Sequence, residues 1–392
     1  MINENRYFIK GKMPQSSVKR PTWTEINLEK LVFNFRSVKK FIGNEVAYMA
    51  VVKADGYGHG AIACARKLVE EGVDWLAVAL LEESIELREN HIEIPILCLG
   101  GFWKGQEKLF LEYDITPVVY QLEIAEKFNE AAQEKKVFAN VHIKIDTGMG
   151  RIGVRYDEVK EFAEKLRKFK NLRVEGIMTH FAAADNLSEN DFTNTQIKRF
   201  DEAVAVFEDN GFRPKFKDMA NSPGAIVHKN SRGNLVRLGG ILYGLGDDVL
   251  PKEAMKPELK AVLSLHSRIA QIKRVPKGET LGYSRTFTTE RDSVIATVPI
   301  GYQDGYRRSL SNRGRAIINN QYVPVVGRIS MDWTILDATD LQVVNVNDEV
   351  ILIGESQNLK VTAEELAGLI ETISYEITCG INRRVNRKYV GG

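Results

Sequence analysis

Short apolar runs alternate with amphipathic segments through the first two thirds of the chain. Stretches such as QLEIAEKFNEAAQEKK and DEVKEFAEKLRKF carry apolar residues three and four positions apart, which predicts helices. The runs between them are short and rich in Val, Ile and Leu, which is typical of buried strands. There are eight of these runs, at residues 47–53, 75–81, 95–100, 116–120, 141–146, 174–181, 216–222 and 235–244.

Eight strand and helix pairs in succession indicate a parallel (β/α)₈ barrel of the TIM type. The helix after the seventh strand must be short, because it has to fit within PGAIVHKN. Beyond residue 258 the pattern changes to strands separated by turns, as in VLSLHSRIAQIKRV, SVIATVPIGY and NDEVILIG. One helix is predicted there, in VTAEELAGLIETIS, with Thr362 as its N-cap and Glu365 three residues later.

These patterns predict an N-terminal arm over residues 1–20, a barrel over residues 21–258 and a mostly β C-terminal domain over residues 259–392. The composition is globular, with 44% hydrophobic and 27% charged residues. A net charge of +2 is too balanced to favour a nucleic-acid partner. The three cysteines lie far apart without metal-ligand spacing, which predicts a reducing compartment and no metal site. Without an apolar signal region or a membrane-length run, we expect a cytoplasmic protein with no membrane partner.

A lysine stands at the end of the first apolar run, in AVVKADGYGHG. Residues 46–52 predict a buried strand, and an ammonium group there is costly unless it is paired, deprotonated or used covalently. Two interpretations of Lys53 are open: a side chain that reaches solvent at the strand end, or a chemically active amine. Asp55 and His59, in the same stretch, are interpreted as turn and capping residues.

More polar residues follow the ends of later strands, where TIM-barrel enzymes place their catalytic groups. After strands seven and eight, Ser222, Gly239 and Gly240 can offer a hydroxyl and backbone N–H groups to a phosphate. Several basic residues at one barrel mouth indicate an anionic ligand. A buried lysine near a phosphate pocket suits pyridoxal phosphate, a cofactor that forms a Schiff base with lysine. Lys144, Asp146 and Arg151 lie at and beyond the end of strand five, and His180 ends strand six. Asn221 and Ser222 end strand seven, and Arg237 lies on strand eight.

Eight motifs occur in order between residues 23 and 390. They are AVVKADGYGHG, KIDTGMGRIGV, THFAAAD, ANSPG, VRLGGILYGL, LGYSRTFTT, VPIGYQDGYRR and VGRISMDW. Together they resemble the alanine racemase family. The resemblance implies a pyridoxal-phosphate isomerase that interconverts L-alanine and D-alanine and supplies D-alanine for cell-wall peptidoglycan. It also implies a homodimer with shared active sites.

The resemblance assigns two bases to opposite faces of the substrate Cα. Lys53 would bind the cofactor covalently and act on one face. Tyr283, in LGYSR, would act on the other face and reach in from the second subunit. His180 would link Tyr283 to Arg237 by hydrogen bonds.

The resemblance also assigns residues that hold the cofactor and the substrate. Arg237 would face the pyridine nitrogen and keep it unprotonated, because a guanidinium stays charged. Arg151 would hold the cofactor phenolate and the substrate carboxylate, and Met331 would add a backbone N–H group. Lys144 can be carbamylated in the family and would then orient Arg151. The other cofactor-binding residues are Tyr57, Asn221, Ser222, Gly239 and Gly240, of which all but Asn221 would hold the phosphate.

Some positions leave the substrate range open. Gly240 stands where the family often has a bulkier apolar residue, Ser330 where a cysteine is common, and Arg383 where an aromatic residue can line the entrance. An arginine there could favour polar or acidic substrates, or turn to solvent. The residues that resemble the family's entrance residues, and that could also be ordinary solvated side chains, are Asp185, Tyr302, Arg308 and Asp332.

Three classes of function compete at this point. A racemase for alanine, or a broader-specificity or serine racemase of the same family, uses both halves of the chain. A cofactor-carrying binding protein would use the barrel alone and lack the LGYSRTF segment. A decarboxylase of similar plan would need an acidic partner for the pyridine nitrogen and a longer glycine-rich phosphate loop, which Arg237 and the Gly239–Gly240 pair disfavour.

Overall fold

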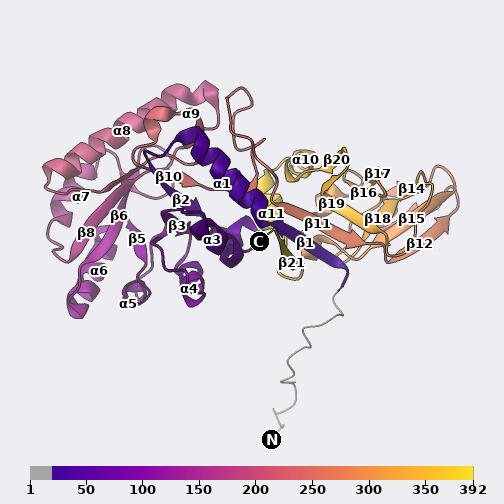
Figure 1. Cartoon of the computed structure of the whole chain (residues 1–392), viewed down its shortest axis with the longest axis horizontal. Coiled ribbons are helices and arrows are strands. Elements are labelled where there is room, and N and C mark those ends of the chain that lie inside the picture. The colour runs from indigo at the N-terminus through magenta and orange to yellow at the C-terminus, as the bar shows by residue number, and fades with distance from the viewer. Residues whose placement is uncertain (1–19, 392) are drawn as a thin grey trace, which may run out of the picture.

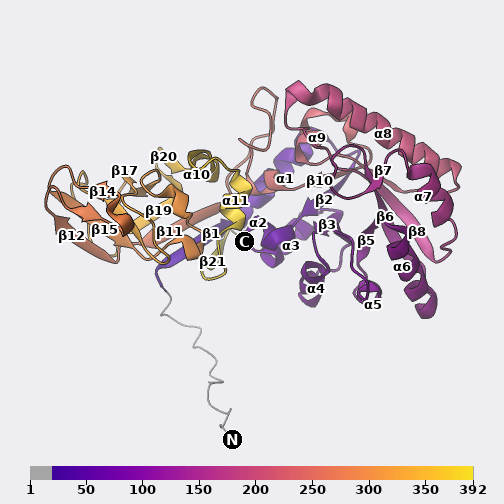
Figure 2. The same cartoon turned by 180° about the vertical axis from the view of Figure 1, so that it is seen from behind.

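The protein is described here by a computed structural model that covers residues 20–391. Its two halves lie side by side, a barrel surrounded by helices and a β-rich half (Figures 1 and 2). The predicted arm over residues 1–20 falls almost entirely outside the described residues.

Eight parallel strands form the barrel, and they follow the order β10-β2-β3-β4-β5-β6-β8-β9. The last two strands approach each other where the Arg237 N–H donates to the Ala220 carbonyl over 2.9 Å, so the barrel is nearly closed. The prediction of a (β/α)₈ barrel is confirmed. The strands are β2 (Ala47–Val51), β3 (Trp75–Val78), β4 (Ile96–Cys98), β5 (Thr116–Val119), β6 (Ala139–Asp146), β8 (Leu172–Met178), β9 (Phe216–Asp218) and β10 (Leu235–Leu238), with β7 (Val154–Arg155) paired to β6.

Helices cover the outside of this barrel (Figure 1). Each buries one apolar stripe, as Ile197, Phe200 and Phe207 do on α8. The helix after the seventh strand, α9, is six residues long, which agrees with the short segment predicted for it. The helices are α1 (Leu28–Ile42), α2 (Lys53–Tyr57), α3 (Ala61–Glu70), α4 (Leu81–Glu89), α5 (Glu107–Glu112), α6 (Leu122–Lys135), α7 (Val159–Leu166), α8 (Asn190–Asp209) and α9 (Ser222–Val227).

The second half is built on a sheet in the order β17-β16-β19-β11-β1-β21, with β20 paired to β19. A three-stranded sheet, β12-β15-β18, and the pair β13-β14 extend it. The Thr362 hydroxyl accepts the Glu365 N–H over 3.0 Å, which confirms the predicted helix cap of α10. The elements are β11 (Leu263–Arg268), β12 (Gln271–Val275), β13 (Thr280–Leu281), β14 (Phe287–Thr288), β15 (Ser293–Val298), β16 (Arg315–Ile318), β17 (Gln321–Pro324), β18 (Thr334–Asp337), β19 (Glu349–Ser356), β20 (Leu359–Val361), α10 (Ala363–Leu369), α11 (Ser374–Cys379) and β21 (Asn386–Val390).

The first strand of the described chain belongs to this β half and not to the barrel. β1 (Thr22–Asn27) pairs antiparallel with β11 and parallel with β21. The expected boundary at residue 21 therefore assigned this strand to the wrong half. The local pattern of TWTEIN identifies a strand, but its partners lie more than two hundred positions away and leave no trace in it.

The two halves meet where α2 lies against α11. Gly58 ends α2 with a φ of +85°, and an added Cβ there would lie 2.1 Å from the Thr378 carbonyl oxygen. Arg387 donates from Nε to the Gly58 carbonyl over 3.0 Å. Backbone atoms of the two halves thus touch beside Lys53, at a position that only glycine can occupy.

We predict that Gly58→Ala disrupts the contact between Gly58 and the Thr378 carbonyl. The new methyl group meets a backbone carbonyl that cannot turn aside, so the free energy of unfolding should fall by more than about 2 kcal/mol. Gly72→Ala is the matched control, because Gly72 has a φ of +81° with no atom within 4 Å of the added Cβ, and it should cost only about 1 kcal/mol. Equal losses in denaturant unfolding would show that backbone strain alone matters at Gly58.

Candidate active site

The lysine singled out from the sequence begins a left-handed turn. β2 ends at Val51, two residues earlier than the predicted strand, and Lys53 is the first residue of α2. The next residues have φ values of 53° (Ala54), 54° (Asp55), 61° (Gly56) and 54° (Tyr57). Non-glycine residues adopt this conformation at a cost of roughly 1–2 kcal/mol each, so the surroundings must impose it.

Hydrogen bonds on several sides hold this turn. Asp55 accepts the Ala61 N–H over 3.0 Å and so caps α3, and Arg387 approaches its carboxylate to 3.7 Å. His59 is fully buried and contacts the carbonyl oxygens of Gly56 and Tyr57 through Nδ1. Asp55 and His59 are therefore turn and capping residues, as expected. The strain of the turn is a local feature that fixes the direction in which Lys53 leaves the barrel wall.

The Lys53 amine lies in surroundings that disfavour its charge. Burial lowers its pKa, and the nearby guanidinium groups of Arg151 and Arg237 lower it further. More of the amine is then neutral, and hence nucleophilic, than at an exposed lysine. This agrees with the chemically active interpretation of Lys53, which is only partly exposed.

Arg237 is a fixed positive charge below the barrel mouth. It lies on β10, only 3% exposed, and its guanidinium forms an ion pair with the buried Asp218 of β9. Its Nη2 donates to the Thr179 carbonyl over 2.9 Å and reaches His180 Nδ1 at 3.3 Å. Since arginine can only donate, His180 accepts at Nδ1 and carries its proton on Nε2. Burial lowers the pKa of His180 and Arg237 adds to this, so the ring is neutral.

Hydroxyl groups gather over the backbone that follows β10. An added Cβ on Gly239 would lie 2.6 Å from the Tyr57 hydroxyl, and the Ser222 hydroxyl accepts the Gly239 N–H over 2.9 Å. An added Cβ on Gly240, the first residue of η3 (Gly240–Tyr243), would lie 2.5 Å from the Tyr375 hydroxyl. Hydroxyls and closely packed N–H groups of this kind suit a phosphate.

Tyr375 was not predicted from the sequence. Gly240 was the available signal, because the missing side chain there leaves the space that the Tyr375 ring occupies. Asn221 caps α9, and its side chain accepts the Gly224 N–H over 3.1 Å. The predicted phosphate residues Tyr57, Ser222 and Gly239 are thus brought together, while Asn221 shapes the helix that carries Ser222.

Lys144 and Arg151 extend the positive charge of the mouth. Burial lowers the pKa of Lys144 to about 7, and the charges of Arg237 and Arg151 contribute. Arg151 is exposed and its guanidinium makes no hydrogen bond within residues 20–391. Asp146 accepts the N–H groups of Gly148 and Gly150, each over 3.0 Å, and so folds the loop that presents Arg151. An unengaged guanidinium beside two buried lysines is suited to an anionic ligand.

The other predicted residues lie on the β half, away from Lys53. Tyr283 is 69% exposed in η4 (Tyr283–Arg285), and its hydroxyl has no hydrogen-bond partner in the described chain. η4 directly precedes β14, which both views place at the end of the β half farthest from the barrel (Figures 1 and 2). Met331 is 50% exposed. One chain therefore does not bring Tyr283 to its own barrel mouth.

A buried carboxylate, Asp304, belongs to a network of charges that reaches a predicted entrance residue. Asp304 accepts two hydrogen bonds from Arg20, over 2.6 and 2.8 Å, and lies 3.4 Å from Arg384. Arg384 in turn donates to the predicted entrance residue Asp332 over 2.7 Å. Arg20 and Arg384 lie outside the quoted motifs, and Asp304 lies within VPIGYQDGYRR but was assigned no role there.

Backbone bonds join the two loops that carry the exposed residues. The Tyr302 N–H donates to Ser330, and the Gln303 N–H donates to Met331, over 3.0 and 3.1 Å. Arg308, the fourth predicted entrance residue, begins the short helix η6 (Arg308–Leu310) in the same half. Asp185 lies on the barrel instead, where it lines a cavity of about 480 Å³ with Asp247 and Asp248.

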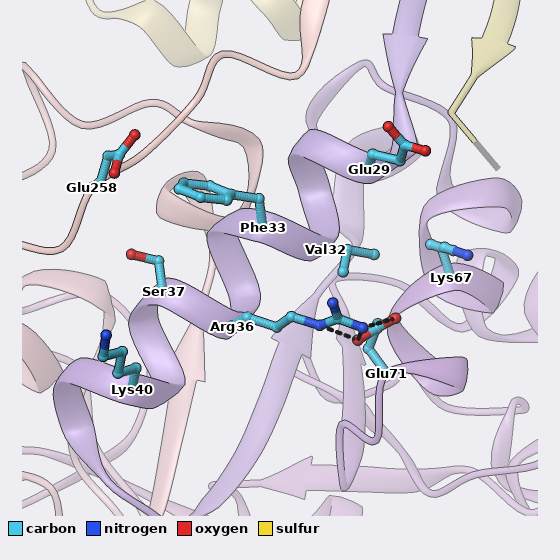
Figure 3. Close-up of a pocket in the computed structure, with 9 residues that line it drawn as sticks. All are labelled: Glu29, Val32, Phe33, Arg36, Ser37, Lys40, Lys67, Glu71 and Glu258. Atoms are coloured by element: carbon cyan, nitrogen blue, oxygen red, sulfur yellow. Dashed lines mark hydrogen bonds and ion pairs between the residues drawn. The ribbon is translucent and has the colours of Figure 1, made fainter.

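A larger cavity, of about 680 Å³, lies on the helices outside the barrel (Figure 3). Arg36 of α1 crosses it and binds Glu71 through hydrogen bonds of 2.8 and 3.0 Å. None of the predicted site residues lines this cavity. The chemistry of the described chain is therefore concentrated at the barrel mouth and not in this groove.

Comparison with known proteins agrees with this geometry. Residues 26–247 match the family described as alanine racemase, N-terminal domain, and residues 262–389 match alanine racemase, C-terminal domain. The chain belongs to the alanine racemase family. The resemblance inferred from the eight motifs is confirmed, and with it membership of a family of isomerases.

Curated relatives and solved structures of the family match along nearly the whole chain. An alanine racemase from Halothermothrix orenii is 42% identical over 380 residues, which is 96% of this chain and 99% of the relative. The structure of an alanine racemase from Clostridium difficile 630 matches with a TM-score of 0.88, at 40% identity, over 95% of this chain and 97% of the other. The alanine racemase from Bartonella henselae, solved with covalently bound pyridoxal phosphate, matches with a TM-score of 0.85, at 30% identity, over 94% and 99%.

Within residues 20–391, no three His, Cys, Asp or Glu side chains lie together as metal ligands would. No helix in the same part of the chain is long and apolar enough to cross a membrane.

We predict that Lys144 makes stability depend on pH. Its pKa of about 7 in the folded protein lies below the ordinary 10.5, so the unfolded chain binds more protons between these values. Stability of the cofactor-free protein should therefore rise from pH 7 to pH 10 relative to Lys144→Met, by a few kcal/mol at most. Denaturant unfolding across this range checks the difference.

The control for this prediction is Lys198→Met, since the Lys198 side chain is 78% exposed on α8. The free energy of unfolding of Lys198→Met should change with pH in the same way as that of the wild type. If the free energy of unfolding of Lys144→Met also changes with pH as that of the wild type does, the buried amine keeps an ordinary pKa.

Proposed function

We propose that this chain interconverts L-alanine and D-alanine with pyridoxal phosphate bound covalently to Lys53. The observation that carries the proposal is the Lys53 amine of lowered pKa, at the mouth of a barrel lined by a phosphate cradle, in a member of the alanine racemase family. An alanine racemase of this family has been solved with the cofactor attached.

The residues at the mouth fit the cofactor. The hydroxyls of Tyr57, Ser222 and Tyr375, which lie close against the backbone at Gly239–Gly240, would hold its phosphate together with the N–H groups there. Arg237, fixed by Asp218, would face the pyridine nitrogen with a charge that cannot be lost. When bound, pyridoxal phosphate withdraws electrons from the bond between the substrate Cα and its hydrogen.

Arg151 and the partner's backbone would orient the substrate. The free guanidinium of Arg151 binds the carboxylate of alanine, and the Met331 N–H of the second subunit supports it. Lys144, whose pKa of about 7 leaves a neutral amine near neutral pH, is suited to carbamylation and would then hold Arg151. The Tyr375 hydroxyl over Gly240 keeps the pocket narrow despite the missing side chain, which favours the small substrate alanine over larger amino acids.

Racemisation needs a proton to leave one face of Cα and another to arrive on the opposite face. Lys53 would exchange the proton on the face of Cα that points to the barrel. Tyr283 would exchange the proton on the opposite face. It would come from the β half of a second subunit, because Tyr283 lies far from the barrel mouth of its own chain. His180, with its proton on Nε2 and Arg237 on Nδ1, is placed to orient the Tyr283 oxygen. A head-to-tail homodimer would form two equivalent sites of this kind.

The same dimer would close the approach to each site. Asp185 of one subunit would face Tyr302, Arg308 and Asp332 of the other, and the Asp304 network would keep the last three in place. We propose that the product, D-alanine, is supplied for the synthesis of cell-wall peptidoglycan.

Mixing two inactive variants tests the shared site. Lys53→Ala should lose racemisation and the visible absorbance of the attached cofactor, and Tyr283→Ala should lose racemisation alone. In a mixed dimer one site carries both changes and the other is intact, so random exchange should restore about a quarter of the wild-type activity. If subunits exchange, as seen with differently tagged copies, and no activity returns, both bases come from one chain.

Isotope exchange tests the assignment of faces. Tyr283→Phe keeps the ring and removes the hydroxyl, so release of the Cα hydrogen of L-alanine into deuterated water should slow by about 10²–10⁴. Release of the Cα hydrogen of D-alanine, which Lys53 would remove, should slow far less in the first turnover. Tyr322→Phe, at another half-exposed tyrosine of the β half, is the control and should leave both rates unchanged. Equal small losses for both enantiomers would contradict the assignment.

A further inference from the structure

Glu83 joins the lysine turn to the neighbouring strand and helix. It is the third residue of α4, and its Oε2 accepts the N–H groups of Ala79 and Leu80 over 2.7 and 3.2 Å. Those two bonds are an ordinary helix cap. Its Oε1 also accepts the Ala54 N–H over 2.6 Å, a bond that spans 29 positions in the sequence.

The bond to Ala54 is not part of the cap of α4, because the N–H group that it binds lies outside that helix. Ala54 directly follows Lys53 and is the first residue of the left-handed turn. A carboxylate that accepts from the ends of both β2 and β3 therefore fixes the point at which the turn begins. Glu83 binds the start of the turn. Arg387 binds the Gly58 carbonyl at its end and also approaches Asp55.

Glu83 also contributes a negative charge that acts on the Lys53 amine. The groups that act on Lys53 are Arg151 and Arg237, which lower its pKa together with burial, and Glu83 and the Cys379 thiol, which raise it. Burial raises the pKa of Cys379, so that group is an uncharged thiol near neutral pH. Glu83 is then a carboxylate whose charge raises the pKa of this amine.

We propose that Glu83 is a positioning residue for Lys53: its carboxylate fixes the first residue of the left-handed turn and keeps one negative charge beside the amine. This inference rests on the proposed role of Lys53 and goes beyond it, since Glu83 itself touches neither substrate nor cofactor. The neighbour Glu82, exposed on the same helix and without a bond to the turn, offers a matched control.

The test measures the amine in the full-length, cofactor-free protein. Lys53 is labelled with acetic anhydride over a range of pH and quantified by peptide mass spectrometry, in the wild type, Glu83→Gln and Glu82→Gln. In Glu83→Gln the pH of half-maximal labelling should fall by up to about 1 unit, a roughly tenfold change in the neutral fraction, because the negative charge is gone. Hydrogen exchange at the Ala54 amide should become at least about tenfold faster. Glu82→Gln should change neither.

A lower melting temperature in Glu83→Gln with unchanged labelling and exchange would make Glu83 a helix cap only and overturn the inference. If Glu83→Gln does not fold, Glu83→Asp decides: it keeps the charge but is one methylene shorter, so exchange at Ala54 should still accelerate while the labelling pH moves little. Unchanged exchange in Glu83→Asp overturns the inference. These measurements need no bound cofactor, so they are independent of whether Lys53 carries pyridoxal phosphate, which the loss of absorbance in Lys53→Ala tests.

Discussion

Crowding of positive charge at the barrel mouth is the constraint on which the rest of the site depends. Lys53, Lys144, Arg151 and Arg237 lie close enough to lower the pKa of the two lysines, and burial adds to the effect. Only Arg237 has a buried carboxylate partner, Asp218. Cations held together in a poorly solvated mouth favour both a neutral, nucleophilic lysine and the arrival of an anion, so reactivity and ligand choice have one cause.

The remaining architecture places groups around this charge. The left-handed turn gives Lys53 its direction, and the glycines after β10 leave room for the hydroxyls of three neighbouring elements. The β half has a different role, because it displays Tyr283 and Met331 on its surface and holds the loop of Asp332 through Asp304 and Arg384. One half carries the proposed cofactor site and the other displays Tyr283, so the site that we propose needs two copies of the chain.

The sequence predicted those parts of the site that are local. Lys53, His180, Ser222 and Arg237 could be placed because residues at the ends of barrel strands share one mouth, and the motifs supplied their roles. Tyr375, Arg20, Asp304 and Arg384 could not be placed, because each acts through a contact far away in the chain. The assignment of β1 failed for the same reason: periodicity identifies a strand, while pairing across the whole barrel sequence is a property of the folded chain.

The pairing of β1 has a consequence for how the protein is made. β1 emerges first from the ribosome but finds its neighbours β11 and β21 only after the entire barrel and the C-terminal strands have followed. The barrel is in effect an insertion within the β half, and it can fold while synthesis continues. β1 must meanwhile remain an unpaired strand with exposed backbone groups. Closure of the β half is therefore a late event in folding, because its strand pairs have a high contact order.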